Sequence, residues 1–246
     1  MWANTEGHGT TKHLDRYLVT LLDPSSFEAE QYRQLRQRVE ELGRARNVRV
    51  LAITSAIAGD GKTITTINLA GALARGHGAR ILVIDADLRH PTVAARLGIE
   101  CTNGGFEAAL QATQGSVMEF VQSIDGSSLA VLPCAARREE TYELLTSARL
   151  AELINEARIH FDYVIIDTPP MIPVQDSGLL RSVVDGYIVV VAANSTPRQL
   201  VAEVLNRLDP ASCVGLVFNR DDRPLFGYYR TYYREYLRSY GRSTSR

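Results

Sequence analysis

The sequence predicts an α/β fold: a mostly parallel sheet with helices on both faces and a phosphate-binding loop at one edge. Short apolar runs alternate with helical stretches, and these runs are continuously apolar, which is typical of strands buried on both faces. A glycine-containing loop with a Lys-Thr pair follows the first run, and acidic residues end two later runs. Ligands of such sheets bind outside the carboxyl ends of the strands, so the loop and the acidic residues are expected to meet there.

The length and composition predict one domain. The chain has 246 residues, 45% of them hydrophobic, which suffices for one sizeable core. We expect an irregular N-terminal segment at 1–24, the domain itself at 25–222 and a tail at 223–246 that is rich in Tyr and Arg. The net charge of −1 excludes a general polyanion binder, and no nucleic-acid partner is expected.

Each element follows from local pattern. Ser25 and Glu28 form a capping-box pattern that predicts a helix from residue 25 to about 42, ending at Gly43. Apolar runs predict strands at 48–54, 81–84, 129–132, 163–166, 187–192 and 214–218. Helices are expected at 63–75, 91–97, 106–112, 117–123, 140–159, 178–184 and 197–208.

The loop from Ala56 to Thr63 carries the main binding signal. It matches the phosphate-loop pattern G-x-x-x-x-G-K-[ST] except that Ala56 replaces the first glycine. Because the loop follows a strand and opens a helix, its amides and the helix dipole favour phosphate oxygens. Lys62 would reach the β and γ phosphates. The nucleotide-binding residues predicted here are Ala58, Gly59, Asp60, Gly61, Lys62, Thr63 and Ile64.

The scarcity of lysine supports this interpretation. The chain has 27 basic residues besides histidine, and only Lys12 and Lys62 are lysines. Arg is a wide planar fork, whereas Lys is a compact charge on a thin stem. A narrow phosphate cradle has room for Lys, which explains why this Arg-rich chain keeps Lys at position 62.

Three carboxylates predict a magnesium site beside the loop. Asp85 and Asp87 follow one apolar run, and Asp167 follows another. Magnesium bound to phosphates takes one or two carboxylates, hydroxyl oxygen and water. The metal ligands predicted are Thr63, Asp85, Asp87 and Asp167, directly or through water.

Cysteine usage and hydropathy indicate a cytosolic protein. Cys101, Cys134 and Cys213 are widely spaced and form no disulfide framework, so reduced thiols are expected. No run of about 18 apolar residues occurs, so no transmembrane helix is predicted. The tail has six Arg and one Glu between Arg223 and Arg246. From charge alone, it suits nucleic acid, a membrane surface, an acidic neighbour or plain solvation.

Taken together, these motifs resemble those of the bacterial tyrosine kinases that control capsule and exopolysaccharide synthesis. The phosphate loop at 56–63, the D-x-D-x-R segment at 82–89 and the D-x-x-P segment at 164–169 match that family's pattern. Its self-association motif E-x-x-R-x-x-R is matched by Glu30, Arg33 and Arg36. Its C-terminal tyrosine cluster is matched by Tyr228, Tyr229, Tyr232, Tyr233, Tyr236 and Tyr240.

The resemblance implies a P-loop NTPase fold of the MinD/ParA type and transfer of the γ-phosphoryl group of ATP, with Mg²⁺, to tyrosine. Lys62, Asp85 and Asp87 are the catalytic residues it implies, with Asp85 as the base, although spacing alone does not separate Asp85 from Asp87. Asn219 resembles the Asn that contacts adenine, and a turn residue is an equally good interpretation. The stretch 137–142 departs from the family's Pro/Asn-rich segment.

The resemblance also implies partners. It predicts a homo-oligomeric ring in which one copy phosphorylates the tail of the next, a membrane-embedded chain-length or co-polymerase protein as activator, and a cognate tyrosine phosphatase. The chain resembles the stand-alone form of the family, so we expect a cytoplasmic protein that reaches the membrane through its partner.

Two alternatives remain. Tail tyrosines at helical spacing suit an interfacial helix, and hence a MinD/ParA-like positioning ATPase without kinase activity. Against it, those ATPases carry a second loop lysine where this chain has Ile57. The other alternative is a module that binds nucleotide without catalysis, and the three carboxylates argue against it.

Overall fold

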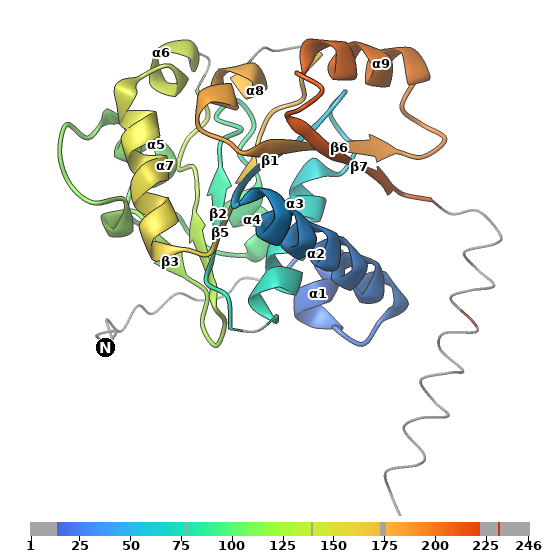
Figure 1. The fold of residues 1–246 in the computed structure, drawn as a ribbon. Coiled ribbons are helices and arrows are strands. Elements are labelled where there is room, and N and C mark those ends of the chain that lie inside the picture. The colour runs from blue at the N-terminus through green and yellow to red at the C-terminus, as the bar shows by residue number, and fades with distance from the viewer. Residues whose placement is uncertain (1–13, 77, 139, 173–175, 222–230, 232–246) are drawn as a thin grey trace, which may run out of the picture.

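The computed structural model describes residues 14–76, 78–138, 140–172, 176–221 and 231. Its seven-stranded sheet has the order β3-β4-β2-β5-β1-β6-β7 (Figure 1). Every neighbouring pair is parallel except β3 and β4. The strands are β1 (Val50–Ser55), β2 (Ile81–Asp85), β3 (Gln122–Ser123), β4 (Leu129–Leu132), β5 (Tyr163–Asp167), β6 (Gly186–Ala192) and β7 (Cys213–Asn219). The predicted fold class is therefore confirmed.

Helices cover both faces of the sheet. The α-helices are α1 (Val19–Leu22), α2 (Phe27–Arg46), α3 (Lys62–Ala74), α4 (Val93–Leu97), α5 (Gly105–Gln111), α6 (Tyr142–Leu145), α7 (Ala148–His160), α8 (Asp176–Leu179) and α9 (Arg198–Arg207). Two 3₁₀ turns are η1 (Val117–Glu119) and η2 (Leu180–Ser182). Apolar side chains of α1 to α4 share one core with the sheet, and those of α5 to α7 share another on its opposite face.

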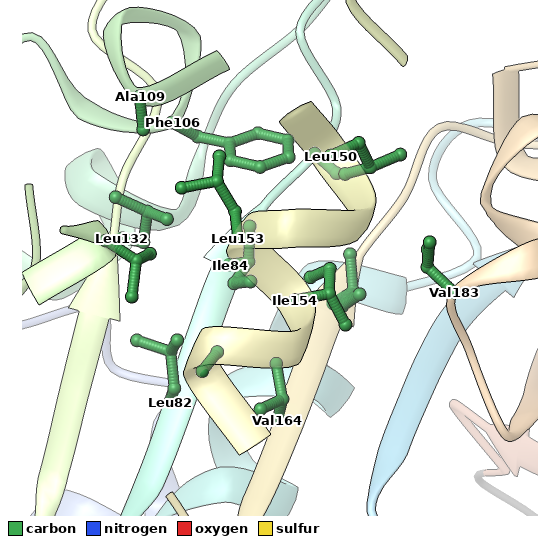
Figure 2. Close-up of a cluster of buried hydrophobic side chains, with 14 of the residues drawn as sticks. Leu82, Ile84, Phe106, Ala109, Leu132, Leu150, Leu153, Ile154, Val164 and Val183 are labelled. Atoms are coloured by element: carbon green, nitrogen blue, oxygen red, sulfur yellow. The ribbon is translucent and has the colours of Figure 1, made fainter. Parts of the chain in front are cut away.

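The continuous apolar strands explain these two cores. Along β1, Val50 belongs to the core under α7 and Leu51 to the core under α3, because successive side chains point to opposite faces. Figure 2 shows the core under α7, in which Leu153 and Ile154 of α7 lie over Ile84 of the sheet. Burial of each large apolar side chain in these cores stabilises the fold by about 1.5–3 kcal/mol.

The parallel strands deliver their following loops to one edge. Asp85 and Asp167, the last residues of β2 and β5, are paired in register. Ile53 of β1 pairs with Asp167, so the loop after β1 begins beside them. The sheet register therefore brings together the three segments that the sequence singled out.

Helix α2 differs from expectation at both ends. Its N-cap is Ser26 rather than Ser25, and the Ser26 side chain accepts a hydrogen bond from the Ala29 amide at 3.1 Å. The helix passes through Gly43 and ends at Arg46, with Asn47 in the left-handed conformation. Gly43 serves packing instead, because a Cβ there would lie 2.6 Å from the Tyr163 hydroxyl oxygen.

The N-terminal segment is not irregular throughout. Residues 14–24 include α1, and Leu18 and Thr20 are buried. The Thr20 amide donates to Asn68 Oδ1 at 3.0 Å, and Asn68 Nδ2 donates to the Tyr17 carbonyl at 2.8 Å. Tertiary hydrogen bonds to α3 therefore order a segment whose own sequence has little helical signal.

Two other expectations need correction. The helix predicted at 140–159 is two helices, α6 and α7, separated at Thr146 and Ser147. The helix predicted at 117–123 is one 3₁₀ turn, η1, followed by the edge strand β3. In the part of the chain that the structure describes, no helix is both long and apolar enough to cross a membrane.

Asp185 gives a test of the fold at the end of the sheet away from these loops. Its Oδ2 accepts hydrogen bonds from the amides of Arg49 and Val50 at 2.8 and 2.7 Å. Its carboxylate also pairs with Arg158 at 2.8 Å. Burial raises the pKa of Asp185, but the bonds from Arg158 and from these amides outweigh burial and hold it below 3.8.

We expect Asp185→Asn to lower the free energy of unfolding by about 2 kcal/mol at pH 7, because an ion pair is lost. A carboxylate with a lowered pKa stabilises the fold above its unfolded pKa, and that contribution disappears as pH falls. Urea titrations of wild type and variant should therefore begin to converge as pH falls below about 4. A difference that widens on acidification would contradict this account.

Candidate functional site

The loop between β1 and α3 has the geometry of a phosphate cradle. Gly59 and Gly61 have φ angles of +91° and +96°, which favour glycine, and Gly61 is the N-cap of α3. Ala56 has no positive φ, so the position where the sequence lacks glycine does not need one. Ala58 and Gly59 lie in the turn between Ala56 and Gly61, and Ile64 is half-buried in the first turn of α3.

The phosphate loop is held from outside by the segment after β6 and by the last residue of β7. Asp60 Oδ1 accepts a hydrogen bond from the Thr196 hydroxyl at 2.7 Å, and Asp60 Oδ2 accepts one from the Ile57 amide at 3.3 Å. Asn219 Nδ2 donates to the Asp60 carbonyl at 2.9 Å. A Cβ on Gly61 would fall 2.0 Å from Asn219 Nδ2, so only glycine fits there. Asn219 therefore lies against the loop, and its contact with adenine stays a prediction.

Lys62 pairs with Asp87 inside the site. The Lys62 ammonium donates to Asp87 Oδ2 at 2.8 Å, with 12% and 2% of the two side chains exposed. Burial by itself lowers the pKa of Lys62, but the charges of Asp167 and Asp87 outweigh it and raise the pKa. Lys62 therefore stays charged and bridges α3 to the loop after β2.

Asp167 binds two hydroxyls of α3. Thr63 Oγ1 donates to Asp167 Oδ2 at 2.6 Å, and Thr66 Oγ1 donates to Asp167 Oδ1 at 3.2 Å. Burial raises the pKa of Asp167, and the Lys62 charge opposes that rise. The Thr92 hydroxyl donates to Thr63 Oγ1 at 3.2 Å. Thr66 and Thr92 were not predicted; Thr66 lies one helical turn beyond Thr63, which is the signal that sequence reasoning missed.

Asp85 is the carboxylate with an unmatched atom. Its Oδ2 accepts from the amides of Thr92 and Val93 at 3.0 Å each, whereas its buried Oδ1 has no hydrogen-bond partner. Burial, with the nearby charge of Asp167, raises the pKa of Asp85 to about 8. A fully buried oxygen without a partner is unusual and indicates a missing ligand.

These residues fit a magnesium ion bound together with phosphate. Asp85 Oδ1 and the Thr63 hydroxyl are hard oxygen ligands near each other, since Thr92 contacts both residues. Within the described ranges, no three His, Cys, Asp or Glu side chains form a complete metal site. Phosphate and water oxygens would therefore have to complete the coordination, as magnesium usually requires.

The predicted self-association residues contact their own chain. Glu30 and Arg33 form an ion pair on α2. Arg36 lies 3.4 Å from Glu40, and its Nη1 donates to the Ala72 carbonyl of α3 at 3.3 Å. Only 17% of the Arg36 side chain is exposed, so it joins α2 to α3. Their role between copies stays a prediction.

The tail tyrosines lie outside the described residues, so their role also stays a prediction. They are Tyr228, Tyr229, Tyr232, Tyr233, Tyr236 and Tyr240. The strand that leads to them, β7, is the last strand of the sheet, and its Phe218 is exposed.

Comparison of sequences relates this chain to known proteins. A family model described as an AAA domain matches residues 48–211. Tyrosine-protein kinase YwqD from Bacillus subtilis (strain 168) is 34% identical over 225 residues, covering 89% of this chain and 93% of that protein. Succinoglycan biosynthesis transport protein ExoP from Rhizobium meliloti (strain 1021) is 33% identical over 211 residues, covering 84% of this chain and 26% of that protein.

Solved structures give the same result for the fold. The chimerical protein CapA2B2 superposes with a TM-score of 0.78 and 26% identity, covering 85% of this chain and 93% of that one. The VpsO kinase domain superposes with a TM-score of 0.67 and 33% identity, covering 80% of this chain and 100% of that one. The cell division ATPase MinD from Pyrococcus furiosus superposes with a TM-score of 0.58 and 23% identity, covering 71% of this chain and 74% of that one. At this identity the likeness concerns the fold alone.

The raised pKa of Asp85 generates a prediction. A carboxyl group whose pKa rises from 3.8 to about 8 on folding binds a proton in the folded state between these values. The folded protein therefore loses stability as pH rises from about 4 to about 8. We expect Asp85→Asn to flatten this decline and to raise Tm at pH 7 without nucleotide, measured by calorimetry in EDTA. A variant that is less stable than wild type at pH 7 and equal to it at pH 4 would contradict the prediction.

Proposed function

Because the chain belongs to the bacterial tyrosine kinase family, we propose that this site transfers the γ-phosphoryl group of ATP to tail tyrosines of a neighbouring copy. The observation that carries the proposal is the Lys62–Asp87 pair at 2.8 Å beside the phosphate loop. It holds a cation at the helix N-terminus where phosphate oxygens would bind. Relatives named as tyrosine kinases support the choice of reaction.

Each site residue has a role in this proposal. The amides from Ala58 to Ile64 and the Lys62 ammonium bind the phosphates, and Lys62 exchanges Asp87 for phosphate oxygens when ATP enters. Thr63 and Asp85 would hold magnesium, directly or through water, and Asp167 accepts a hydrogen bond from the Thr63 hydroxyl and orients it. A bound magnesium ion would neutralise the charge that develops on the transferred group. Asn219 holds the loop and lines the adenine side.

Proton transfer from tyrosine needs a carboxylate base. Asp87 becomes available when Lys62 leaves it, and Asp85 is the base that the family resemblance favours. Asp85 Oδ2 accepts hydrogen bonds from two backbone amides, and Oδ1 has no hydrogen-bond partner. Asp85 would bind magnesium directly or through water, and we propose that the proton goes to whichever of Asp85 and Asp87 the metal leaves free. Both are catalytic residues in this proposal, together with Lys62.

The same proposal covers partners and biological role. Relatives include a protein named for succinoglycan biosynthesis transport, which supports a role in exopolysaccharide or capsule synthesis and export. A membrane-embedded chain-length or co-polymerase protein would act as activator and bring the kinase to the membrane from the cytoplasm. Copies would assemble in a ring, and a tyrosine phosphatase would reset the tail.

The alternative is a MinD-like positioning ATPase. The similarity to MinD concerns the fold and carries no activity. Ile57 stands where such ATPases place a second lysine, and it packs in the core with Ala52 and Val189. That apolar contact favours the kinase over the positioning ATPase.

Lys62→Met tests the mechanism. Incubated with Mg-ATP and the proposed membrane activator, the wild-type chain should gain phosphate on tail peptides, and the variant should gain none, because the phosphates lose their cation. Lys12→Met, which removes the other lysine, is the matched control and should behave as wild type. Phosphopeptide mass spectrometry gives the readout. Phosphate that persists on the tail of Lys62→Met would contradict the proposed role of Lys62.

Replacing the six tail tyrosines by Phe separates substrate from catalyst. Affinity for ATP should stay within about twofold of wild type, because the cradle is untouched. Mixing this variant with Lys62→Met should phosphorylate the Lys62→Met copies, which is transfer between chains. Collapse of ATP binding in the Phe variant would instead make the tail part of the site.

The ring proposal predicts that Glu30→Ala with Arg33→Ala lowers the mass measured by light scattering toward that of one chain. Arg36 is left unchanged because it joins α2 to α3. The control is Arg38→Ala with Glu41→Ala, which removes the exposed i,i+3 ion pair of the same helix. If both double variants assemble as wild type does, the motif has no role between copies.

A further inference from the structure

A cluster around the buried Asp176 carboxylate contacts the loop that follows β2 and carries Asp87. Arg89 Nε donates to Asp176 Oδ2 at 2.8 Å, and Arg89 Nη2 lies 3.5 Å from Asp176 Oδ1. The Thr141 hydroxyl donates to Asp176 Oδ2 at 2.7 Å and accepts from Arg89 Nη2 at 3.1 Å. Asp176 and Thr141 are 6% and 1% exposed. Three segments distant in sequence are thus joined through one carboxylate.

The same loop is fixed at a second point. The Arg138 amide donates to the Leu88 carbonyl at 2.7 Å, and the Arg138 side chain pairs with the buried Glu107. Leu88 itself is 1% exposed. Leu88, the residue between Asp87 and Arg89, is therefore held through its carbonyl and its buried side chain, and Arg89 anchors the same loop one residue further along.

Asp176 also follows the segment that borders the phosphate loop. After β5, the Met171 amide donates to the Ser55 carbonyl at 2.9 Å, and the Ile172 amide donates to the Ala56 carbonyl at 3.3 Å. The chain then reaches α8, which starts at Asp176. Asp176 is four positions after Ile172 in the sequence, so its bond to Arg89 ties the loop that carries Asp87 to a residue that follows the segment beside the phosphate loop.

We propose that Asp176 is a positioning residue for phosphoryl transfer: through Arg89 and Thr141, it restrains the loop after β2 and so fixes where Asp87 lies relative to Lys62. The inference rests on the proposed function of this site. Burying the Asp176 carboxylate is unfavourable unless its partners are held in good geometry. Bidentate contact with Arg supplies that geometry, which a neutral pair would define less sharply.

The proposal separates ATP binding from chemistry. The groups expected to bind ATP belong to the phosphate loop and α3, and none of them contacts Asp176. Asp87 belongs to the loop that Asp176 restrains, and a misplacement of about 1 Å in such a group reduces rate by about 100-fold. Loss of the restraint should therefore lower kcat and leave ATP affinity nearly unchanged.

The test uses the full chain with Asp176→Asn, Arg89→Gln and the double variant. Initial rates of tyrosine phosphorylation at saturating Mg-ATP give kcat, and a fluorescent ADP analogue gives Kd. We expect each single variant to lose about 10- to 100-fold in kcat with Kd within about threefold. The double variant should be no slower than the slower single variant, because both act through one contact.

Two further variants keep the test decisive. Asp185→Asn breaks the Asp185–Arg158 ion pair at the opposite end of the strands, so it should lose stability and keep its kcat. Thr141→Val removes only the bridging hydroxyl, and it serves where Asp176→Asn fails to fold; it too should lower kcat and spare Kd. Circular dichroism gives the folded fraction used to normalise every rate.

Three results would overturn the inference: unchanged kcat in Asp176→Asn or Thr141→Val, a rise in Kd that accounts for the lost activity, or an equal loss of kcat in Asp185→Asn. Failure of the proposed function is distinguishable from these. In that case the wild-type chain phosphorylates tyrosine no faster than Lys62→Met does, whatever the state of Asp176.

Discussion

The structure depends on holding three carboxylates out of water beside one ammonium group. Asp85, Asp87 and Asp167 are at most 2% exposed, and Lys62 pairs with one of them at 2.8 Å. Burial raises the pKa of Asp85 and of Asp167, and the neighbouring carboxylates add to the rise. The site is therefore strained electrostatically until cations arrive, and the proposed magnesium ion would supply the charge it lacks. The strain that lowers stability without ligand is the same feature that favours Mg-ATP binding.

The sheet makes this arrangement possible at little conformational cost. Parallel register sets Asp85 opposite Asp167, and α3 begins beside them with Lys62 and Thr63 in its first turn. Backbone hydrogen bonds also hold the loop after β2: the Ala86 amide donates to the Asp167 carbonyl at 2.8 Å, and the Arg138 amide donates to the Leu88 carbonyl at 2.7 Å. The charged groups consequently have few alternative positions, and phosphoryl transfer is a reaction in which positioning and charge neutralisation dominate.

The sequence was sufficient to predict the fold class and, in the described part of the chain, every strand apart from the two-residue β3. It also predicted that Lys62, Thr63 and the three carboxylates converge, because parallel strands deliver the loops that follow them to one edge of the sheet. It failed where tertiary contacts decide. Gly43 was predicted to end the helix, but it lies within α2, where Tyr163 of β5 packs against it. Residues 14–24 looked irregular, although bonds to Asn68 order them. Asp176 and Arg89 are 87 positions apart, and no local pattern links them.

The central claim is that Lys62 pairs with Asp87 in the nucleotide-free site and moves to phosphate when ATP binds. The chain has only two lysines, so NMR of lysine-labelled protein should give two side-chain signals, with the Lys12→Met variant assigning them. Asp87→Asn should shift the Lys62 signal without nucleotide, and a non-hydrolysable Mg-ATP analogue should bring both proteins to the same shift. A Lys62 signal indifferent to Asp87→Asn, or unmoved by the nucleotide, would contradict the account.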